Sequence, residues 1–219
     1  LLKRVYQYVV ERELRRQLGE FYTPDWLAKY IVWRSLHTLV YGEPPRGVFA
    51  KDIDGELVNL IDEFYKRTGR IPRFVDPACG SFTFGVQYLN TLLDWYYRKS
   101  LDIHPVKFAE MLLDSVVGID LNPVAAITAK VNYLLQIHRL LTAKGEYLHE
   151  EPMIPIYRID LVALHEMCSS RDVRVSTLEP YIMSVSNTIN LDISLTSMGI
   201  SADKISELSK GGLKVESGR

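Results

Sequence analysis

The chain has 219 residues, of which 47% are hydrophobic and 24% are charged, and its formal net charge is −1. This composition supports a full core and predicts one domain, or one domain with an appendage. No apolar run reaches the ~18 residues of a membrane-spanning helix, and the charge balance does not favour a nucleic-acid-binding surface. The two cysteines are too few for a disulfide framework. Neither they nor the five scattered histidines have the spacing of zinc ligands. We therefore expect a cytosolic protein without a metal site.

Residues 1–70 have the pattern of successive helices. The first is an amphipathic segment that ends at Gly19, because glycine is common just after the last turn of a helix. Its apolar stripe holds Val5, Val9 and Leu14. Thr23 is a natural N-cap and Pro24 a natural first helical residue, so a helix is expected from Pro24 to about Tyr41.

From residue 71 to residue 165 the chain alternates between short apolar runs and helical segments. Strands are expected at 73–76, 115–119 and 154–159. Further helices are expected at 56–69, 82–99, 105–113 and 124–141. The order strand, helix, strand, helix, strand predicts an α/β fold with a doubly wound parallel sheet, in which ligands bind beyond the carboxyl ends of the strands. The remaining segment, 166–219, is rich in serine and threonine and receives no assignment.

Each expected strand is followed by an aspartate or ends in one: Asp76, Asp120 and Asp160. A carboxylate in this place can accept hydrogen bonds from both vicinal hydroxyls of a ribose. Because acidic residues repel phosphate, a nucleoside without phosphate fits them better than a dinucleotide does. An aspartate after a strand is also common as a turn or capping residue, and this alternative stays open for each of them. Tyr22 and Trp26 likewise have the spacing of core aromatics, and Cys79 is favoured as a small packed residue over a nucleophile.

Three short motifs follow one another along the chain: GEFYTP at 19–24, DPACGS at 76–81 and GIDLNP at 118–123. In this order they resemble the N-terminal motifs of the S-adenosylmethionine-dependent adenine-N6 DNA methyltransferases. The resemblance is to the modification subunits of type I restriction systems and to fused restriction-modification enzymes in particular, and it covers about residues 10–165. It implies a Rossmann-like methyltransferase fold preceded by helices, and S-adenosylmethionine as the cofactor. It also implies that the full-length protein or complex acts on DNA, with a specificity or nuclease subunit or domain as partner.

The resemblance implies this set of cofactor-binding residues: Tyr22, Thr23, Pro24, Asp76, Pro77, Ala78, Gly80, Ser81, Asp120, Leu121 and Asp160. Asp76 matches the carboxylate that faces the ammonium end of the cofactor, and Gly80 the glycine that allows close backbone approach. Asp120 matches the residue that holds both ribose hydroxyls. Asp160, in YRIDLVAL, is similar to the residue that accepts a hydrogen bond from the adenine amino group. The segment around Thr23 matches one that closes over the methionine part, whose carboxylate a hydroxyl and helix N-terminal amides can receive.

The chain departs from the family at Phe82, where the family usually has the second glycine of a Gly-x-Gly turn. If the backbone φ angle is positive there, phenylalanine strains the turn. If φ is negative, the ring can turn away from the ligand and be tolerated. A ring that lies against the ligand would weaken or abolish cofactor binding.

The catalytic signature of the family, Asn-Pro-Pro-Tyr or a close variant after the third strand, does not occur in the 219 residues. The nearest string, LEPY at 178–181, keeps only the final Pro-Tyr, so no catalytic residue is assigned. Because the chain starts with Leu1 inside a helical pattern, we expect a piece of a longer protein. Two interpretations stay open: the cofactor-binding part of a methyltransferase, inactive alone, or a degenerate methyltransferase fold that serves as a structural or assembly partner. A dehydrogenase is disfavoured, because the turn at 80–82 lacks the full GxGxxG.

Overall fold

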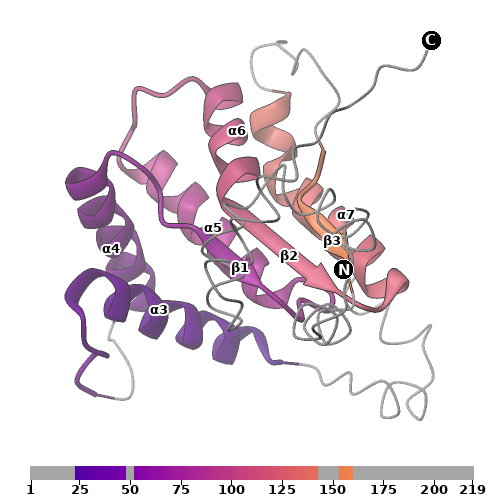
Figure 1. Ribbon diagram of the computed structural model, residues 1–219. Helices are drawn as coiled ribbons and strands as arrows, with labels where there is room; N and C mark the ends of the chain where they lie inside the picture. The colour runs from indigo at the N-terminus through magenta and orange to yellow at the C-terminus, as the bar shows by residue number, and fades with distance from the viewer. Residues whose placement is uncertain (1–22, 48–51, 143–152, 160–219) are drawn as a thin grey trace, which may run out of the picture. The chain divides into compact units, whose positions relative to one another are not determined.

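The computed structural model describes residues 23–47, 52–142 and 153–159. These residues form an α/β unit of five helices and a three-stranded parallel sheet, with two helices preceding the first strand (Figure 1). The helix expected before Gly19 and the chain from Asp160 onward lie outside the described residues.

The first described helix, α3 (Asp25–Tyr41), confirms the helix expected after GEFYTP. Its N-cap is Pro24 rather than Thr23, and the Pro24 carbonyl accepts two hydrogen bonds of 3.0 Å from N–H groups of the first turn. No side-chain hydrogen bond caps this end. The helix ends at Gly42, whose φ of 81° is the left-handed conformation that glycine adopts at little cost.

The second helix, α4 (Ile53–Thr68), begins before the expected residue 56. The reason is a cap that the apolar pattern did not reveal: the Asp52 carboxylate accepts a hydrogen bond of 2.9 Å from the Gly55 N–H. This side chain satisfies one of the N–H groups that a helix start leaves unpaired. The loop therefore ends at Asp52, and α4 gains a turn.

The three expected strands are confirmed as β1 (Phe74–Asp76), β2 (Val116–Asp120) and β3 (Ile156–Arg158). They pair in the order β1-β2-β3, and both pairs are parallel. In this register Asp76 lies opposite Gly118. Because parallel strands point the same way, the loops that leave β1 and β2 start at the same edge of the sheet.

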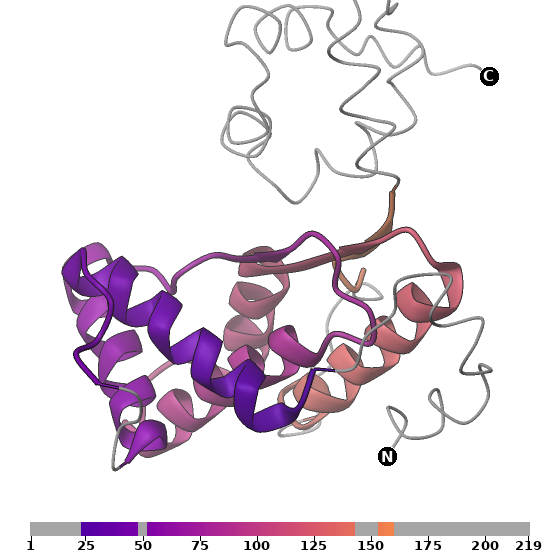
Figure 2. The ribbon, with the colours of Figure 1, turned by 90° about the horizontal axis from the view of Figure 1, so that it is seen from below.

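The connections between the strands are helical. From β1 the chain passes through α5 (Thr83–Arg98) and α6 (Pro105–Ser115) to β2, and α7 (Pro123–Leu141) leads from β2 to β3. Figure 2 shows the described helices together on one face of the sheet. α3 packs against both α4 and α5, and α7 packs against α5, α6 and the strands β2 and β3.

The core fills the space between these helices and the sheet. Its largest fully buried side chains are Trp95, Tyr88, Tyr133, Phe82, Phe108, Leu57, Ile61, Leu89, Leu92, Leu112, Ile137 and Leu140. The buried tyrosines keep their polar ends paired, since the Tyr88 hydroxyl donates to the Pro72 carbonyl at 2.6 Å and the Tyr133 hydroxyl to the Leu112 carbonyl at 2.8 Å. These bonds fix α5 to the entry of β1 and α7 to α6.

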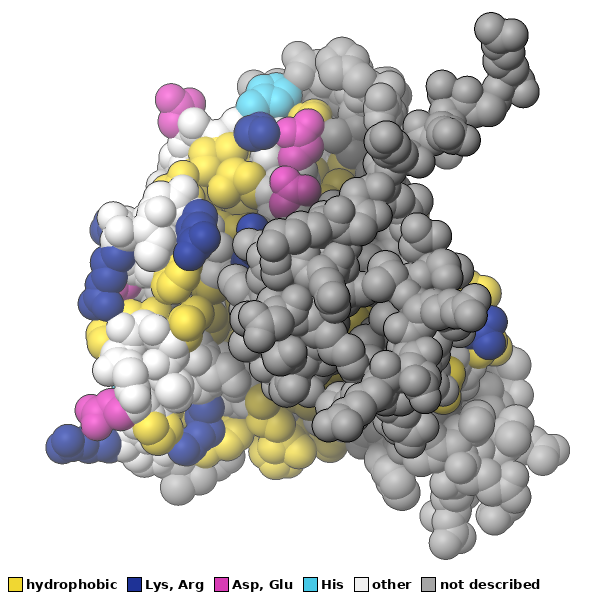
Figure 3. All heavy atoms as spheres, in the orientation of Figure 1, with side chains coloured by type: hydrophobic (Ala, Val, Ile, Leu, Met, Phe, Trp, Pro, Cys, Tyr) yellow, Lys and Arg dark blue, Asp and Glu magenta, His cyan; other side chains and the backbone are white. Residues whose placement is uncertain are grey.

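On the part of the surface that is coloured in Figure 3, lysine and arginine side chains lie scattered among apolar and acidic ones and form no continuous basic patch. Within the described ranges, no helix has both the length and the apolar content to span a bilayer.

Candidate functional site

The turn that leaves β1 is held against the end of β2 by backbone hydrogen bonds. The Cys79 N–H donates to the Ile119 carbonyl at 2.8 Å, and the Phe82 N–H donates back to the Cys79 carbonyl at 2.7 Å. Gly80, between them, has a φ of +52°, which only glycine adopts without strain. A Cβ at Gly80 would meet no atom within 4 Å, so the backbone there faces open space.

Asp120 joins this turn to the loop after β2. Its Oδ2 accepts a hydrogen bond of 2.7 Å from the Gly80 N–H, and its Oδ1 accepts one of 2.8 Å from the Asn122 N–H. The carboxylate therefore has the turn-forming role that sequence reasoning kept as an alternative. An ionised carboxylate has about four lone-pair sites, so two of them remain for a ligand hydroxyl pair. Asn122 caps α7, as expected, by accepting from the Val124 N–H at 2.9 Å.

Asp76 differs from Asp120 in having one oxygen without a partner. Its Oδ1 accepts a long hydrogen bond of 3.3 Å from the Ala78 N–H, whereas its Oδ2 is buried and has no hydrogen-bond partner among the described residues. Burial raises the pKa of Asp76; the Ala78 N–H opposes this, and the nearby charge of Asp120 adds to it. A buried carboxylate oxygen without a donor is costly, and a cationic donor would remove that cost.

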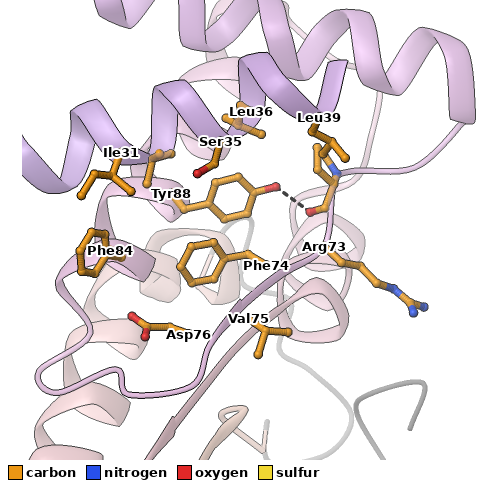
Figure 4. Close-up of a pocket in the computed structure, with 12 residues that line it drawn as sticks. Ile31, Ser35, Leu36, Leu39, Arg73, Phe74, Val75, Asp76, Phe84 and Tyr88 are labelled. Carbon is orange, nitrogen blue, oxygen red and sulfur yellow. Dashed lines mark hydrogen bonds between the residues drawn. The ribbon is translucent and has the colours of Figure 1, made fainter. Parts of the chain in front are cut away.

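Asp76 also borders a pocket of about 280 Å³ between α3, β1 and the first turns of α5. The wall is largely apolar and is formed in part by Ile31, Leu36, Phe74 and Phe84. Figure 4 shows the Asp76 carboxylate at one end of this pocket, near the Phe74 and Phe84 rings. Small-molecule sites commonly measure about 300–1,000 Å³, so this hollow suits one part of a ligand rather than a whole cofactor.

The apolar wall of the pocket escaped sequence reasoning. Helical spacing marks which residues of α3 and α5 are apolar, but it does not show which of them face a hollow instead of a neighbour. Ile31 and Phe84 belong to ordinary amphipathic patterns, and only the packing of α3 against α5 turns them into a lining.

Phe82 lies at the N-cap of α5 with φ 69° and ψ 37°, which is the left-handed conformation that favours glycine. Its ring is fully buried, stacks on Tyr133 at 5.6 Å between centroids and meets Phe74 edge-on at 6.3 Å. The ring therefore lies in the helical layer and does not occupy the space beyond the strand ends. Each of the two alternatives for this position describes it only in part. The φ angle of Phe82 is positive, and yet its ring is turned into the core, away from the strand ends.

Two glycines make room for this ring. A Cβ at Gly85 would lie 2.1 Å from Cζ of Phe82, and a Cβ at Gly118 would lie 2.8 Å from Cε2. Neither position tolerates a side chain while the ring is in place. The signal in the sequence was a glycine inside the first turn of an expected helix, three residues after the unusual phenylalanine.

The structure brings part of the expected site together. Asp76, Gly80 and Asp120 lie around one turn, and the Ser81 carbonyl accepts a hydrogen bond of 2.9 Å from Nδ2 of Asn132. Pro77, Ala78 and Leu121 are exposed beside them. Thr23 and Pro24 lie at the start of α3, which borders the Asp76 pocket through its later turns. Tyr22 and Asp160 lie outside the described residues.

Cys79 is buried, and burial raises the pKa of its thiol, with the charges of Asp76 and Asp120 adding to the effect. This environment suits a packed residue and not a nucleophile. Within the described ranges no group of three or more His, Cys, Asp or Glu side chains is placed to hold a metal ion. In comparisons with known proteins, no protein-family model matches this sequence and no curated protein matches it.

Proposed function

We propose that this chain carries the S-adenosylmethionine-binding part of a DNA adenine-N6 methyltransferase from a restriction-modification system. The observation that carries the proposal is the pair of aspartates at the carboxyl ends of adjacent parallel strands, one of which, Asp76, has a buried oxygen without a donor. Parallel α/β sheets bind ligands at this edge. The motifs GEFYTP, DPACGS and GIDLNP support the choice of cofactor.

The residues present fit the charges of this cofactor. The unpaired Oδ2 of Asp76 would accept a hydrogen bond from the ammonium group, and the remaining lone pairs of Asp120 would accept the ribose hydroxyls. Gly80 offers a backbone without a Cβ where the ligand approaches. When bound, the cofactor supplies a methyl group on a cationic sulfur for transfer to an amine. Asp76 would orient it and balance its charge.

The sheet also supports an incomplete doubly wound architecture. In the common doubly wound order 3-2-1-4-5-6, the first strand is central and each half contributes helices to one face. The order β3-β2-β1 with described helices on one face corresponds to one such half. Among the described residues β1 pairs only with β2, so its other edge is open for a further strand. A catalytic loop and the recognition of DNA would belong to that second half or to a specificity or nuclease partner.

A second function stays in competition, that of a non-catalytic assembly module with this fold. The observation in its favour is that Asp120 already satisfies two loop N–H groups, so it has a structural role without any ligand. The sequence also lacks Asn-Pro-Pro-Tyr. The two functions differ in cofactor binding, because the assembly module does not need it.

Asp120→Ala is expected to weaken S-adenosylhomocysteine binding, since hydrogen bonds to a charged group contribute about 1.5–3 kcal/mol. Calorimetry on folded protein measures the change, and a melting curve separates it from the loosening of the two loops. Asp102→Ala, an exposed aspartate between α5 and α6, is the matched control and should bind like wild type. Equal affinity in Asp120→Ala and wild type would remove Asp120 from the site.

The 219-residue chain alone is expected not to methylate DNA. Adenine must be flipped out of the duplex at a cost of a few kcal/mol and held in a pocket, and the sequence contains no Asn-Pro-Pro-Tyr to hold it. The near-neutral net charge also supplies little phosphate attraction. Incubation with labelled S-adenosylmethionine and mixed-sequence duplex, followed by digestion, measures N6-methyladenine. Turnover above a no-protein control would show that the LEPY string at 178–181 works as a catalytic loop.

A further inference from the structure

Strand β3 ends in Arg158, whose register partner on β2 is Asp120. Register partners on parallel strands project from the same face of the sheet, and neighbouring strands are about 4.8 Å apart. The two side chains nevertheless have different partners and form no ion pair with each other. Oδ2 of Asp120 accepts from the Gly80 N–H, on the side of β1. Arg158 donates from Nε to the Leu121 carbonyl at 3.3 Å, in the loop that leaves β2.

This hydrogen bond holds the Arg158 guanidinium group in place and leaves most of its donors unused. A guanidinium group has five N–H groups, and the bond to Leu121 takes one of them. Arg158 is exposed, and Leu121 is an apolar residue that is 58% exposed. The end of β3 therefore offers a planar cation beside an apolar side chain, at the edge of the sheet that also holds Asp76 and Asp120.

The cofactor proposed for this edge has its ammonium group and its base on opposite sides of a ribose. The ammonium group belongs to the chain that carries the sulfur, and adenine is attached across the sugar ring from that chain. With the ammonium group at Asp76 on β1 and the ribose hydroxyls at Asp120 on β2, the base points away from β1. The order β1-β2-β3 puts the end of β3 next in this direction, so the base meets Arg158 there.

On the basis of the proposed cofactor site, we propose that Arg158 binds the adenine base by laying its guanidinium plane against the face of the ring. Arginine stacks on aromatic faces in this way. A contact with the edge of the base would bring arginine N–H groups against the adenine amino group, donor against donor, and a face contact avoids this. Phosphate is the other frequent partner of an exposed arginine, but the carboxylate of Asp120 beside it repels phosphate.

Two ligands that differ only in the base test this role. S-adenosylhomocysteine carries adenine, whereas S-ribosylhomocysteine has a hydroxyl group in its place. We expect Arg158→Ala to weaken binding of the first by about threefold to thirtyfold, the range that corresponds to cation–π contacts from exposed to desolvated sites. The affinity for S-ribosylhomocysteine, measured by competition calorimetry, should not change. Arg46→Ala removes the same charge from the exposed loop after α3 and should bind both ligands like wild type.

Arg158→Lys separates the stacking from the hydrogen bond to the loop. Lysine can still donate to the Leu121 carbonyl but has no plane to lay on a ring, so this variant should also bind S-adenosylhomocysteine more weakly than wild type. Equal affinity of wild type and Arg158→Ala would overturn the role of Arg158 alone. Equal weakening of both ligands would overturn it too, because the arginine would then act through the loop. A wild-type chain that binds neither ligand would refute the cofactor site itself, and the role of Arg158 with it.

Discussion

Phe82→Gly is expected to lower the free energy of unfolding, although it places glycine at a left-handed position. The substitution relieves a backbone strain of about 1–2 kcal/mol. It also deletes a fully buried ring that contacts Tyr133 and Phe74, and loss of a buried phenylalanine costs about 3–5 kcal/mol. The second effect is larger, so urea unfolding should show a net loss of stability.

The same packing predicts an unusual rescue. Gly85→Leu alone should destabilise strongly, because its Cβ would lie 2.1 Å from the Phe82 ring. In the Phe82→Gly background the ring is gone, and leucine at position 85 can occupy the vacated space. The double variant should therefore be more stable than either single variant. Additive losses in the double variant would contradict the shared space, and Phe84→Gly, which removes a half-buried ring of the same turn, should give no such rescue.

Cofactor affinity separates the two roles that Phe82 can have. The ring lies in the core and not beyond the strand ends, so the folded Phe82→Gly variant should bind S-adenosylhomocysteine with unchanged affinity. Stronger binding in the variant would mean that the ring occupies space that the ligand uses.

Asp76→Asn is expected to have opposite effects on stability and binding. It removes a buried charge whose Oδ2 has no donor, so the free energy of unfolding at neutral pH should rise. It also removes the acceptor proposed for a cationic group, and affinity for S-adenosylmethionine should fall about tenfold to a hundredfold, as expected for a hydrogen bond of about 1.5–3 kcal/mol. Asp102→Asn, on an exposed loop, should change neither quantity.

The pH dependence of stability tests the expected gain in stability of Asp76→Asn. Because burial raises the pKa of Asp76, the folded chain holds this proton more tightly than the unfolded chain does. Wild type therefore loses stability relative to Asp76→Asn as pH rises from the ordinary aspartate pKa through the raised one. Below the ordinary value the difference should no longer change with pH, because the carboxyl group is neutral in both the folded and the unfolded chain. Parallel stability curves for the two proteins over this range would contradict the buried, unpaired state of Asp76.

Much of the described fold follows from local pattern. The strands β1, β2 and β3 and the extent of α3 agree with expectations, because short apolar runs that end in aspartate and a Thr-Pro start are strong local signals. The cap of α4 was missed, since Asp52 stands before the apolar pattern begins. Pattern can place an element but does not show which polar side chain closes its end.

The site was predictable only as far as the strand ends. That Asp76 and Asp120 share an edge follows from parallel pairing, whereas the partners of their oxygens depend on the path of the turn between them. Phe82 shows the same limit. The sequence at this position allowed either a strained turn or a ring turned aside. The ring's place follows only from its packing with Gly85 of the same helix and Gly118 of β2.

Calorimetric titration of the folded wild-type chain with S-adenosylhomocysteine tests whether the sheet edge formed by Asp76 and Asp120 binds S-adenosylmethionine, as we propose. We expect saturable binding at one site, weakened in Asp76→Asn and Asp120→Ala and unchanged in Asp102→Asn. Absence of saturable heat up to about 1 mM ligand, equivalent to a binding free energy weaker than about −4 kcal/mol, would contradict a cofactor site at this edge and favour the assembly module.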